Sequence, residues 1–253
     1  MSWGDLVREL DSWAEAGRIA EFWWRDDDAG DATDALERLI ALHGGHNVPL
    51  LLAVIPARAQ ERLADRIRAE ADIVISQHGW AHLNHSPPGR AKAELGPDRP
   101  PSYVLGELAR GAFVLDRVFG DNWLRVLVPP HNRIAPEVVA GLRSAGYIGL
   151  STDKPRRAGP AGLTQVNAHI DIMNWSTRAF LGDDPALDLA IRHLRDKRAG
   201  NADPGEPTGL LTHHLAHDEA AWGFTDRFLG AIATHRAARW CDVREIFQPR
   251  EAA

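Results

Sequence analysis

Two groups of potential metal ligands in this chain each follow a run of apolar residues. His78 and His82, separated by three residues, come just after the β-branched run 72–76, and three consecutive aspartates, 26–28, come just after the apolar run 19–24. Short apolar runs of this kind are typical of β-strands. Neutral imidazole and carboxylate groups are ligands of zinc-like metals. Two strand ends that both carry such ligands predict a metal site.

Two histidines and one aspartate would form a three-ligand site with an open position, which is how a catalytic zinc is held. A metal in such a site polarises a carbonyl oxygen and lowers the pKa of bound water to about 7. A second aspartate of the triplet could take the proton of the water as general base. A further histidine, His213 or His214, could protonate the leaving group. Together these roles describe metal-assisted hydrolysis of an amide or an ester.

Length and composition restrict the class of protein. The chain has 253 residues, is 44% hydrophobic and 25% charged, and carries a net charge of -6 with acids and bases interspersed. That pattern is typical of a globular domain and argues against a nucleic acid or a membrane as partner. The single cysteine, Cys241, excludes an intrachain disulfide. Without a secretion signal at the N-terminus or an apolar run of ~20 residues, we expect a cytoplasmic protein. The sequence does not indicate an oligomeric state.

Strand and helix patterns alternate about eight times without a break in composition, as in parallel sheets built from right-handed βαβ units. We expect a single domain over residues 1–253, with an N-terminal helix at about 5–17 and a catalytic core at about 19–248. The core would contain strands at 19–24, 49–55, 72–77, 124–128, 147–151, 163–170 and 209–212, helices at 33–42, 59–70, 102–119, 136–145, 186–198 and 219–234, and a short final run at 238–243.

Polar clusters follow five of these strands. In a closed barrel the C-terminal ends of all strands share one face and form the active site. In an open sheet only the clusters near the switch point would meet. The five clusters favour the barrel; they are residues 26–28, 78–82, 129–133, 171–175 and 213–214.

The order of these motifs matches a known superfamily. The chain resembles the polysaccharide deacetylases (NodB-homology superfamily, also called carbohydrate esterase family 4). Members carry an Asp-Asp pair, a His-(Ser/Thr)-x-x-His, an Arg-x-Pro-x segment, an Asp-x-x-x-Trp and a Leu-x-Leu-His. The matches span nearly the whole chain, from about residue 22 to 218: Asp26-Asp27, His78-Gly79-Trp80-Ala81-His82, Val128-Pro129-Pro130-His131, Asp171-Ile172-Met173-Asn174-Trp175 and Leu210-Leu211-Thr212-His213.

This resemblance implies a fold and a cofactor. The fold would be a distorted (β/α)7-type barrel with the active site at the C-terminal ends of the strands. The cofactor would be a divalent metal ion, usually Zn2+, with Co2+, Ni2+ or Mn2+ as alternatives. His78 and His82 would be two of its ligands.

The resemblance also divides roles among the three aspartates. In the family the first aspartate of the pair is the catalytic base and the second binds the metal. A Thr opens the following helix six residues after the metal-binding Asp, and Thr33 is six residues after Asp27. We therefore assign Asp26 as base and Asp27 as ligand. The alternative, with Asp27 as base and Asp28 as ligand, remains open.

Three positions depart from the family pattern. Gly79 stands where the family has Ser or Thr, so the hydroxyl that usually supports that loop is missing. Val128 replaces the Arg that orients the catalytic base, and Arg25 or Arg133 could supply the guanidinium instead.

The third departure is a doubled histidine where the family has one general acid. We prefer His213 over His214, because His213 occupies the strand-end position of the motif.

The reaction we expect is removal of an acetyl group, from nitrogen or oxygen, from a sugar. The alternatives are hydrolysis of a small non-sugar amide on the same barrel, or a carbohydrate-binding barrel without catalysis. We expect Asp26, His213, Arg25 and Asp171 to be catalytic and Asp27, His78 and His82 to bind the metal. Residues expected to contact the acetylated sugar or related small substrate are Pro130, His131, Asn132, Trp175, Trp80 and His214.

Overall fold

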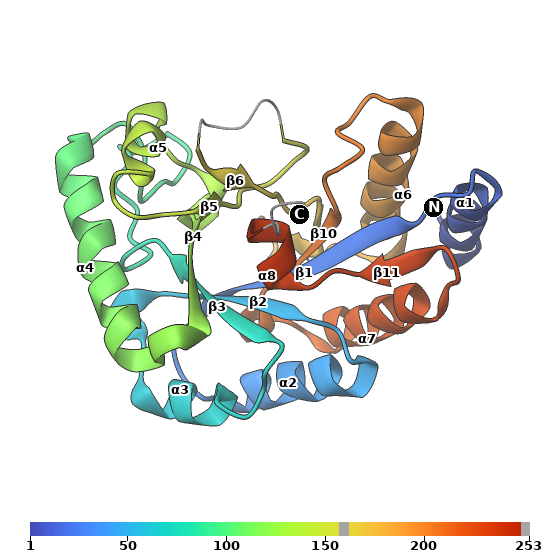
Figure 1. The fold of residues 1–253 in the computed structure, drawn as a ribbon, viewed down its shortest axis with the longest axis horizontal. Helices are drawn as coiled ribbons and strands as arrows, with labels where there is room; N and C mark the ends of the chain where they lie inside the picture. The colour runs from blue at the N-terminus through green and yellow to red at the C-terminus, as the bar shows by residue number, and fades with distance from the viewer. Residues whose placement is uncertain (157–161, 249–253) are drawn as a thin grey trace, which may run out of the picture.

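The computed structural model, which describes residues 1–156 and 162–248, contains a curled sheet of nine parallel strands (Figure 1). Eight strands are hydrogen-bonded in the order β6-β5-β4-β3-β2-β1-β10-β7, and β11 pairs with β1. The strands are β1 (Ala20–Ala29), β2 (Leu50–Val54), β3 (Ile73–His78), β4 (Trp123–Val128), β5 (Gly149–Leu150), β6 (Thr164–Gln165), β7 (Ile170–Asp171), β10 (Thr208–Thr212) and β11 (Ala238–Trp240).

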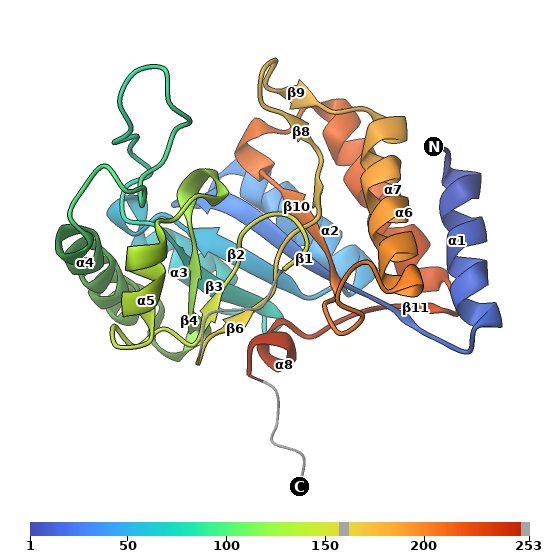
Figure 2. The ribbon, with the colours of Figure 1, turned by 90° about the horizontal axis from the view of Figure 1, so that it is seen from above.

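Most of the helices lie on the outer side of this sheet (Figures 1 and 2), whereas the last one packs on its inner side, where Val243 and Phe247 contact a cluster that contains Trp23. The apolar stripes of the helices, such as Leu6, Leu10 and Trp13, are buried against the strands or against neighbouring helices. The helices are α1 (Trp3–Glu15), α2 (Asp34–His46), α3 (Glu61–Ile67), α4 (Pro101–Phe119), α5 (Pro136–Leu142), α6 (Asp183–Ala199), α7 (Glu219–Thr234) and α8 (Val243–Phe247). The expected α/β barrel class is therefore confirmed, with strands and helices alternating as predicted.

The barrel is open between its two end strands, β6 and β7. These strands have only two residues each, and the expected continuous strand at 163–170 is divided between them. The division lies at Asn167, whose backbone N–H is donated to the buried Glu206 carboxylate at 2.9 Å. The chain thus leaves one edge of the sheet and reaches the other within a few residues.

Strand β1 lies at the centre of the sheet, between β2 and β10. It does not end at Trp24 as expected but continues through the aspartates to Ala29. Its pairing with β2 shifts register between Asp26 and Ala29, which marks a β-bulge. Charged residues can remain within this buried strand because each meets a polar partner, as described below.

One element was not expected from the sequence. The segment after β7 forms an antiparallel pair, β8 (Met173–Asn174) with β9 (Ala179–Phe180), above the C-terminal ends of the strands (Figure 2). This hairpin carries Trp175 in its turn.

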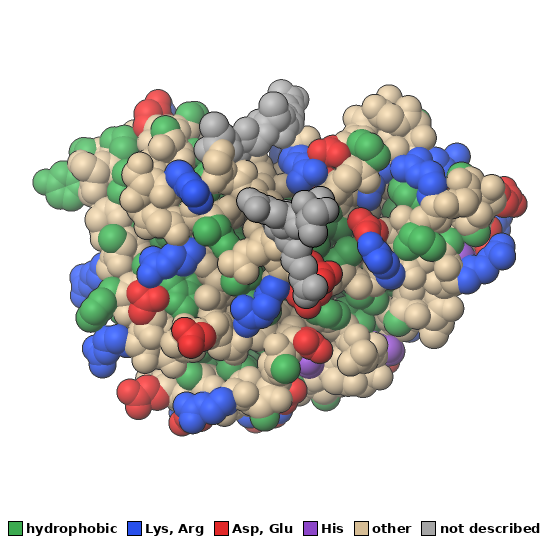
Figure 3. Space-filling view, viewed as in Figure 1, with side chains coloured by type: hydrophobic (Ala, Val, Ile, Leu, Met, Phe, Trp, Pro, Cys, Tyr) green, Lys and Arg blue, Asp and Glu red, His purple; other side chains and the backbone are tan. Residues whose placement is uncertain are grey.

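The surface carries charges of both signs, as the composition suggests. On the face shown in Figure 3, acidic and basic side chains are interspersed rather than gathered by sign. Within residues 1–156 and 162–248, no helix is both long and apolar enough to cross a membrane.

Candidate active site

The two predicted histidine ligands meet an aspartate at the C-terminal ends of β1 and β3. The Asp28 Oδ1 atom lies 3.1 Å from His78 Nε2 and 3.3 Å from His82 Nε2. The ligand atoms of these three residues all lie within 4.8 Å of one another. His78 and Asp28 are held by strands, whereas His82 is in the loop that follows β3 and has a left-handed φ of 59°.

This donor set fits a divalent metal ion. The Nδ1 atom of His78 is 3.0 Å from the Val128 carbonyl oxygen, so Nδ1 carries the proton and Nε2 presents its lone pair. Metal-binding histidines are oriented in the same way by a carbonyl or carboxylate on the other ring nitrogen. The Asp28 Oδ1 atom is buried and accepts no hydrogen bond among the described residues. One carboxylate oxygen and two imidazole nitrogens are the ligands of an open zinc-type site.

Electrostatics favour an ionised Asp28. Burial by itself raises the pKa of this carboxyl group, but the close approach of His78, together with the charges that His213 and His82 can carry, lowers it well below its usual range. Burial and the nearby charge of His78 lower the pKa of His82. These two shifts favour the protonation states that bind metal, a carboxylate and a neutral imidazole. Burial lowers the pKa of His78, but the charges of Asp27 and Asp28 outweigh burial and raise it, so a metal would displace a proton from that ring.

The structure therefore places Asp28, rather than the expected Asp27, in the ligand group. The cause is the β-bulge in β1, where Asp28 has a φ of 75°. A bulge inserts an extra residue and redirects the side chains that follow it. The alternative left open by the sequence, Asp27 as base and Asp28 as ligand, fits the geometry.

Asp27 is fixed by a buried guanidinium. The Arg25 Nε atom lies 3.0 Å from Asp27 Oδ1, and Nη2 donates to Asp27 Oδ2 at 3.2 Å. Arg25 has no exposed surface, and its other donors reach Ser151 Oγ at 2.7 Å and Asn132 Oδ1 at 2.7 Å. Such a rigid fork fixes the orientation of a carboxylate.

Arg25 thus brings a guanidinium to Asp27, which Val128 cannot do. Of the two candidate arginines, Arg25 contacts Asp27, whereas Arg133 is exposed and donates to the Lys92 carbonyl oxygen at 3.0 Å.

His213 lies on the other side of Asp27. Its Nε2 atom is 3.9 Å from Asp27 Oδ2, and its Nδ1 atom has no hydrogen-bond partner among the described residues. The Trp175 ring stands at 78° to the His213 ring with centroids 4.4 Å apart. Trp175 is in turn held by its Nε1–H, which donates to Asp171 Oδ2 at 2.7 Å. Asp171 therefore positions the wall of the site through Trp175.

Asp26 and His214 form a separate buried pair behind the site. The His214 Nδ1 atom lies 2.5 Å from Asp26 Oδ1, and Thr212 Oγ1 donates to Asp26 Oδ2 at 2.6 Å. Burial raises the pKa of Asp26, but the charge and hydrogen bonds of His214 and Thr212 outweigh burial and lower it. Both side chains have no exposed surface.

The structure thus places two predicted site residues away from the histidine group. Because neither Asp26 nor His214 has exposed surface, the geometry does not favour Asp26 as the base or His214 as a contact of the substrate. The pair instead ties the end of β10 to β1, which fixes the backbone on either side of His213.

The loop between the two metal-ligand histidines rests on a glutamate that the sequence did not single out. Glu94, 1% exposed, accepts the backbone N–H groups of Trp80 at 3.0 Å and Ala81 at 2.7 Å. Gly79 has a φ of 59°, and a Cβ there would lie 2.0 Å from Glu94 Oε2 and 2.6 Å from Pro130. Glycine at position 79 therefore has a physical reason, because Glu94 occupies the space that a side chain there would need and itself supports the loop. From the sequence, Gly79 was noted but Glu94 was not, because Glu94 lies in a loop whose residues show no periodicity.

The other residues predicted to contact substrate lie at different distances from the group formed by Asp28, His78 and His82. The His131 ring is 4.6 Å from the His82 ring, and burial, His82 and His78 lower the pKa of His131 to about 4. Pro130 packs against Gly79. The Trp80 ring lies under the guanidinium of Arg110 on α4, 4.6 Å away, so it packs on that helix.

A second group with the same composition lies at the opposite ends of the strands. The ligand atoms of His169, His193 and Glu206 are also within 4.8 Å of one another. However, His169 Nδ1 accepts the Gly209 N–H at 2.9 Å, so in the neutral ring Nε2 carries the proton and faces Glu206 Oε2 at 3.4 Å. A protonated Nε2 is a donor and not a ligand. This group is therefore an internal polar cluster whose members hydrogen-bond to neighbouring groups, such as the Gly209 and Asn167 N–H groups.

Comparison with known proteins identifies the fold. No family model and no curated protein matches the sequence. Among solved structures, the chain is similar to a Mycobacterium smegmatis protein described as a polysaccharide deacetylase, with a TM-score of 0.66 and 16% identity over 91% of this chain and 89% of that one.

Two further similar structures cover the chain to the same extent. The peptidoglycan N-acetylglucosamine deacetylase Bc1960 gives a TM-score of 0.56 at 17% identity, over 96% of this chain and 99% of that one. A family 4 acetyl xylan esterase from Clostridium thermocellum, in complex with a cobalt ion, gives 0.53 at 14% identity, over 90% of both chains. The chain has the fold of the polysaccharide deacetylases and family 4 carbohydrate esterases, as the motifs predicted.

Proposed function

We propose that this protein is a metal-dependent hydrolase that removes an acetyl group from a carbohydrate. The observation that carries the proposal is the adjacency of two carboxylates with different partners at one edge of the sheet. Asp28 shares the histidine group, and Asp27 is clamped by Arg25. The substrate class is supported by the similar structures, which are described as deacetylases and esterases of polysaccharides.

Asp28, His78 and His82 would hold the divalent ion, most simply zinc. When bound, the ion supplies a Lewis acid that activates water and polarises the acetyl carbonyl. The protein supplies the ligand geometry, since strand positions and the hydrogen bond from His78 Nδ1 to the Val128 carbonyl fix the direction of the ligand atoms.

Asp27 accepts the proton of the attacking water as general base. Arg25 holds the Asp27 carboxylate in one orientation, which a general base needs if it is to reach the proton. His213, whose Nε2 atom lies 3.9 Å from Asp27 Oδ2, donates a proton to the departing nitrogen or oxygen. Trp175 is 48% exposed beside His213 and offers a flat apolar face to a sugar ring.

The buried Arg25 weakens the case for a binding barrel without catalysis. That alternative rested on the absence of the motif arginine, whose position on β4 is occupied by Val128. Arg25, on β1, supplies a guanidinium to Asp27 instead. We therefore favour an active enzyme.

The test begins with the metal content of the purified protein, measured by mass spectrometry beside His82→Ala. We expect about one zinc-like ion per chain and its loss in the variant. Acetate release is then measured from N-acetylated chito-oligosaccharides and from O-acetylated xylan, with zinc or cobalt added. The two substrates separate amide from ester cleavage.

The role of Asp27 is tested by Asp27→Asn, which should keep the metal and lose about 10²–10⁴-fold in turnover, as expected for loss of a general base. The matched control is Asp31→Asn, an aspartate paired with Arg62 outside the site, which should leave turnover unchanged. Near-normal turnover of Asp27→Asn would refute the assignment. Metal binding without acetate release from either substrate would refute the hydrolase itself.

A further inference from the structure

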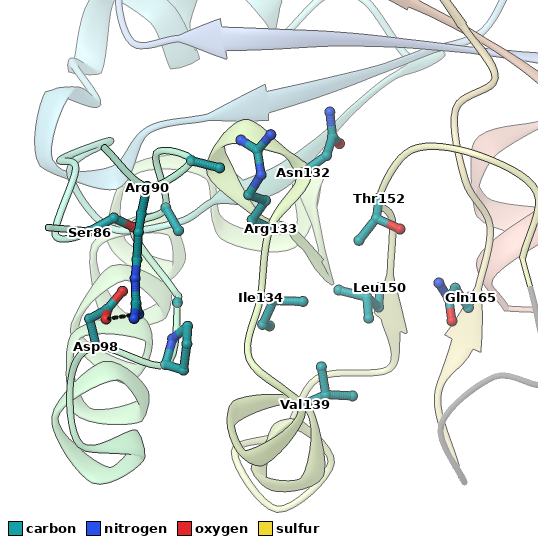
Figure 4. Close-up of a pocket in the computed structure, with 14 residues that line it drawn as sticks. Ser86, Arg90, Asp98, Asn132, Arg133, Ile134, Val139, Leu150, Thr152 and Gln165 are labelled. Carbon is teal, nitrogen blue, oxygen red and sulfur yellow. Dashed lines mark hydrogen bonds and ion pairs between the residues drawn. The ribbon is translucent and has the colours of Figure 1, made fainter. Parts of the chain in front are cut away.

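A cavity adjoins the candidate site on the side of β4 and β5. It has a volume of about 720 Å³, within the range of small-molecule sites, and lies between the loop 83–98 and the segment that follows β4 (Figure 4). Ile134 and Leu150 point toward each other across it, and Val139 lies below them. These side chains give the cavity an apolar floor.

Polar groups of the cavity connect it directly to the base. The Asn132 side chain accepts from Arg25 Nη2 at 2.7 Å, and the Thr152 carbonyl oxygen accepts from Arg25 Nη1 at 3.1 Å. Both residues line the cavity. Arg25 thus links Asp27 to two residues of the cavity wall.

The net charge of the residues that line this cavity differs in sign from that of the whole chain. The chain as a whole carries a net charge of -6. The charged residues that line the cavity are Arg90, Asp98 and Arg133, and Arg90 donates to Asp98 at 3.1 Å, so these two offset each other.

Arg133 is left without a carboxylate. Its Nη1 donates to the Lys92 carbonyl oxygen at 3.0 Å, and neither Arg133 nor Lys92 forms an ion pair within the described part of the chain. The guanidinium of Arg133 thus adds positive charge and free N–H donors at the cavity.

We propose that this cavity binds a sugar residue bearing a carboxylate, adjacent to the acetylated residue, with Arg133 as the group that recognises the charge. The placement of this sugar next to the acetylated residue rests on the proposed function. A guanidinium pairs with a carboxylate through two parallel hydrogen bonds. One unpaired lining guanidinium matches the single charge of a uronic acid, whereas a phosphate monoester carries about two. Asn132, Thr152 and Gln165 offer partners to sugar hydroxyls.

The experiment compares two tetrasaccharides of equal length. Hyaluronan tetrasaccharide carries carboxylates and N-acetyl groups, and tetra-N-acetylchitotetraose carries N-acetyl groups only. Binding of each is measured by calorimetry to the Asp27→Asn protein, so that turnover does not interfere. We expect the carboxylated saccharide to bind about tenfold tighter or better, as one charge-assisted pair provides.

Arg133→Gln should abolish that preference and leave the neutral saccharide unaffected. The control is Arg68→Gln, an exposed arginine at the C-terminal end of α3 that pairs with Asp65. This variant should change the binding of neither saccharide. Ile134→Trp, which fills the cavity, should weaken both saccharides. Equal binding of the two saccharides, a preference that survives Arg133→Gln, or full binding by Ile134→Trp would each overturn the proposal.

Hydrolysis of 4-nitrophenyl acetate separates this proposal from the proposed function. The small ester does not reach the cavity, so Arg133→Gln should hydrolyse it at the normal rate. Selective binding of the carboxylated saccharide in a protein that hydrolyses no acetyl compound would support the cavity and refute the hydrolase. Acetate release with no preference for carboxylated saccharides would support the hydrolase and overturn the cavity assignment.

Discussion

Two clusters in this protein each bring two histidines and one carboxylate together, with ligand atoms within 4.8 Å of one another, yet only one fits a metal. Asp28, His78 and His82 lie at the C-terminal ends of the strands, and His169, His193 and Glu206 lie at the opposite ends. The difference lies in the second nitrogen of one ring. In the first cluster His78 Nδ1 faces a carbonyl oxygen, and in the second His169 Nδ1 accepts a backbone N–H.

That difference decides the chemistry of the ring nitrogen that faces the carboxylate. A carbonyl partner places the proton on Nδ1 and leaves Nε2 free to bind a metal. An N–H partner places the proton on Nε2, the nitrogen that lies 3.4 Å from the Glu206 carboxylate, and leaves no lone pair there for a metal. Short distances among candidate ligands therefore do not by themselves indicate a metal site. The hydrogen-bond partner of the other ring nitrogen decides whether a histidine can be a ligand.

Deleting the carboxylate from each cluster should give opposite results. Asp28→Ala should reduce metal affinity at least about 100-fold, because one of three ligands is lost, with little change in the free energy of unfolding of the metal-free protein. Glu206→Gln should leave metal content unchanged and destabilise the fold by about 1–3 kcal/mol, since buried N–H groups lose a charged acceptor.

Metal content by mass spectrometry and urea unfolding in the presence of a chelator measure the two effects. Loss of a bound ion in Glu206→Gln would show that the second cluster binds metal, and the argument from the His169 tautomer would fail.

The support beneath the first cluster should be the next most sensitive feature. Glu94→Gln places an amide where two backbone N–H groups need an acceptor, and should lower metal affinity about 10–100-fold without removing a ligand. The measurement is a competition titration of zinc against a chelator. Glu37→Gln, an exposed glutamate on α2, is the matched control. An unchanged affinity in Glu94→Gln would mean that the loop between His78 and His82 holds its shape without Glu94.

Much of the fold follows from the sequence because its strands are apolar runs with polar residues at their ends. The order of elements and the five clusters at the C-terminal ends of the strands were predicted in this way. The resemblance of the motifs then identified the barrel, and the structure confirms it.

The details of the site depend on features that local patterns do not encode. The choice between Asp27 and Asp28 rests on a bulge inside β1, and three consecutive aspartates show no periodicity that would reveal it. Glu94 acts on a loop more than ten residues earlier in the chain. Arg25 was one of two candidates for the missing guanidinium, and only the three-dimensional contact with Asp27 selects it.

The second cluster should reveal itself through the pH dependence of stability. Burial, and then the charges of His169 and Lys197, lower the pKa of His193 to about 2. In the unfolded chain this histidine takes up a proton below pH ~6.5, whereas in the folded protein it stays neutral. Its contribution to stability is therefore complete above pH ~6.5 and is lost as the pH falls towards the folded value.

The expected size is about 1.4 kcal/mol per pH unit, or about 2 kcal/mol between pH 6.5 and 5. His193→Gln keeps a polar group near Thr208 but cannot take up the proton, so its unfolding free energy should decline less over this range by about that amount. His131 and His217, whose pKa values are also lowered, remain in both proteins and cancel in the comparison. Urea unfolding at the two pH values gives the difference directly. Equal losses in the two proteins would show that His193 is protonated in the folded state, and Glu206 would then be paired with a charged cluster rather than a neutral one.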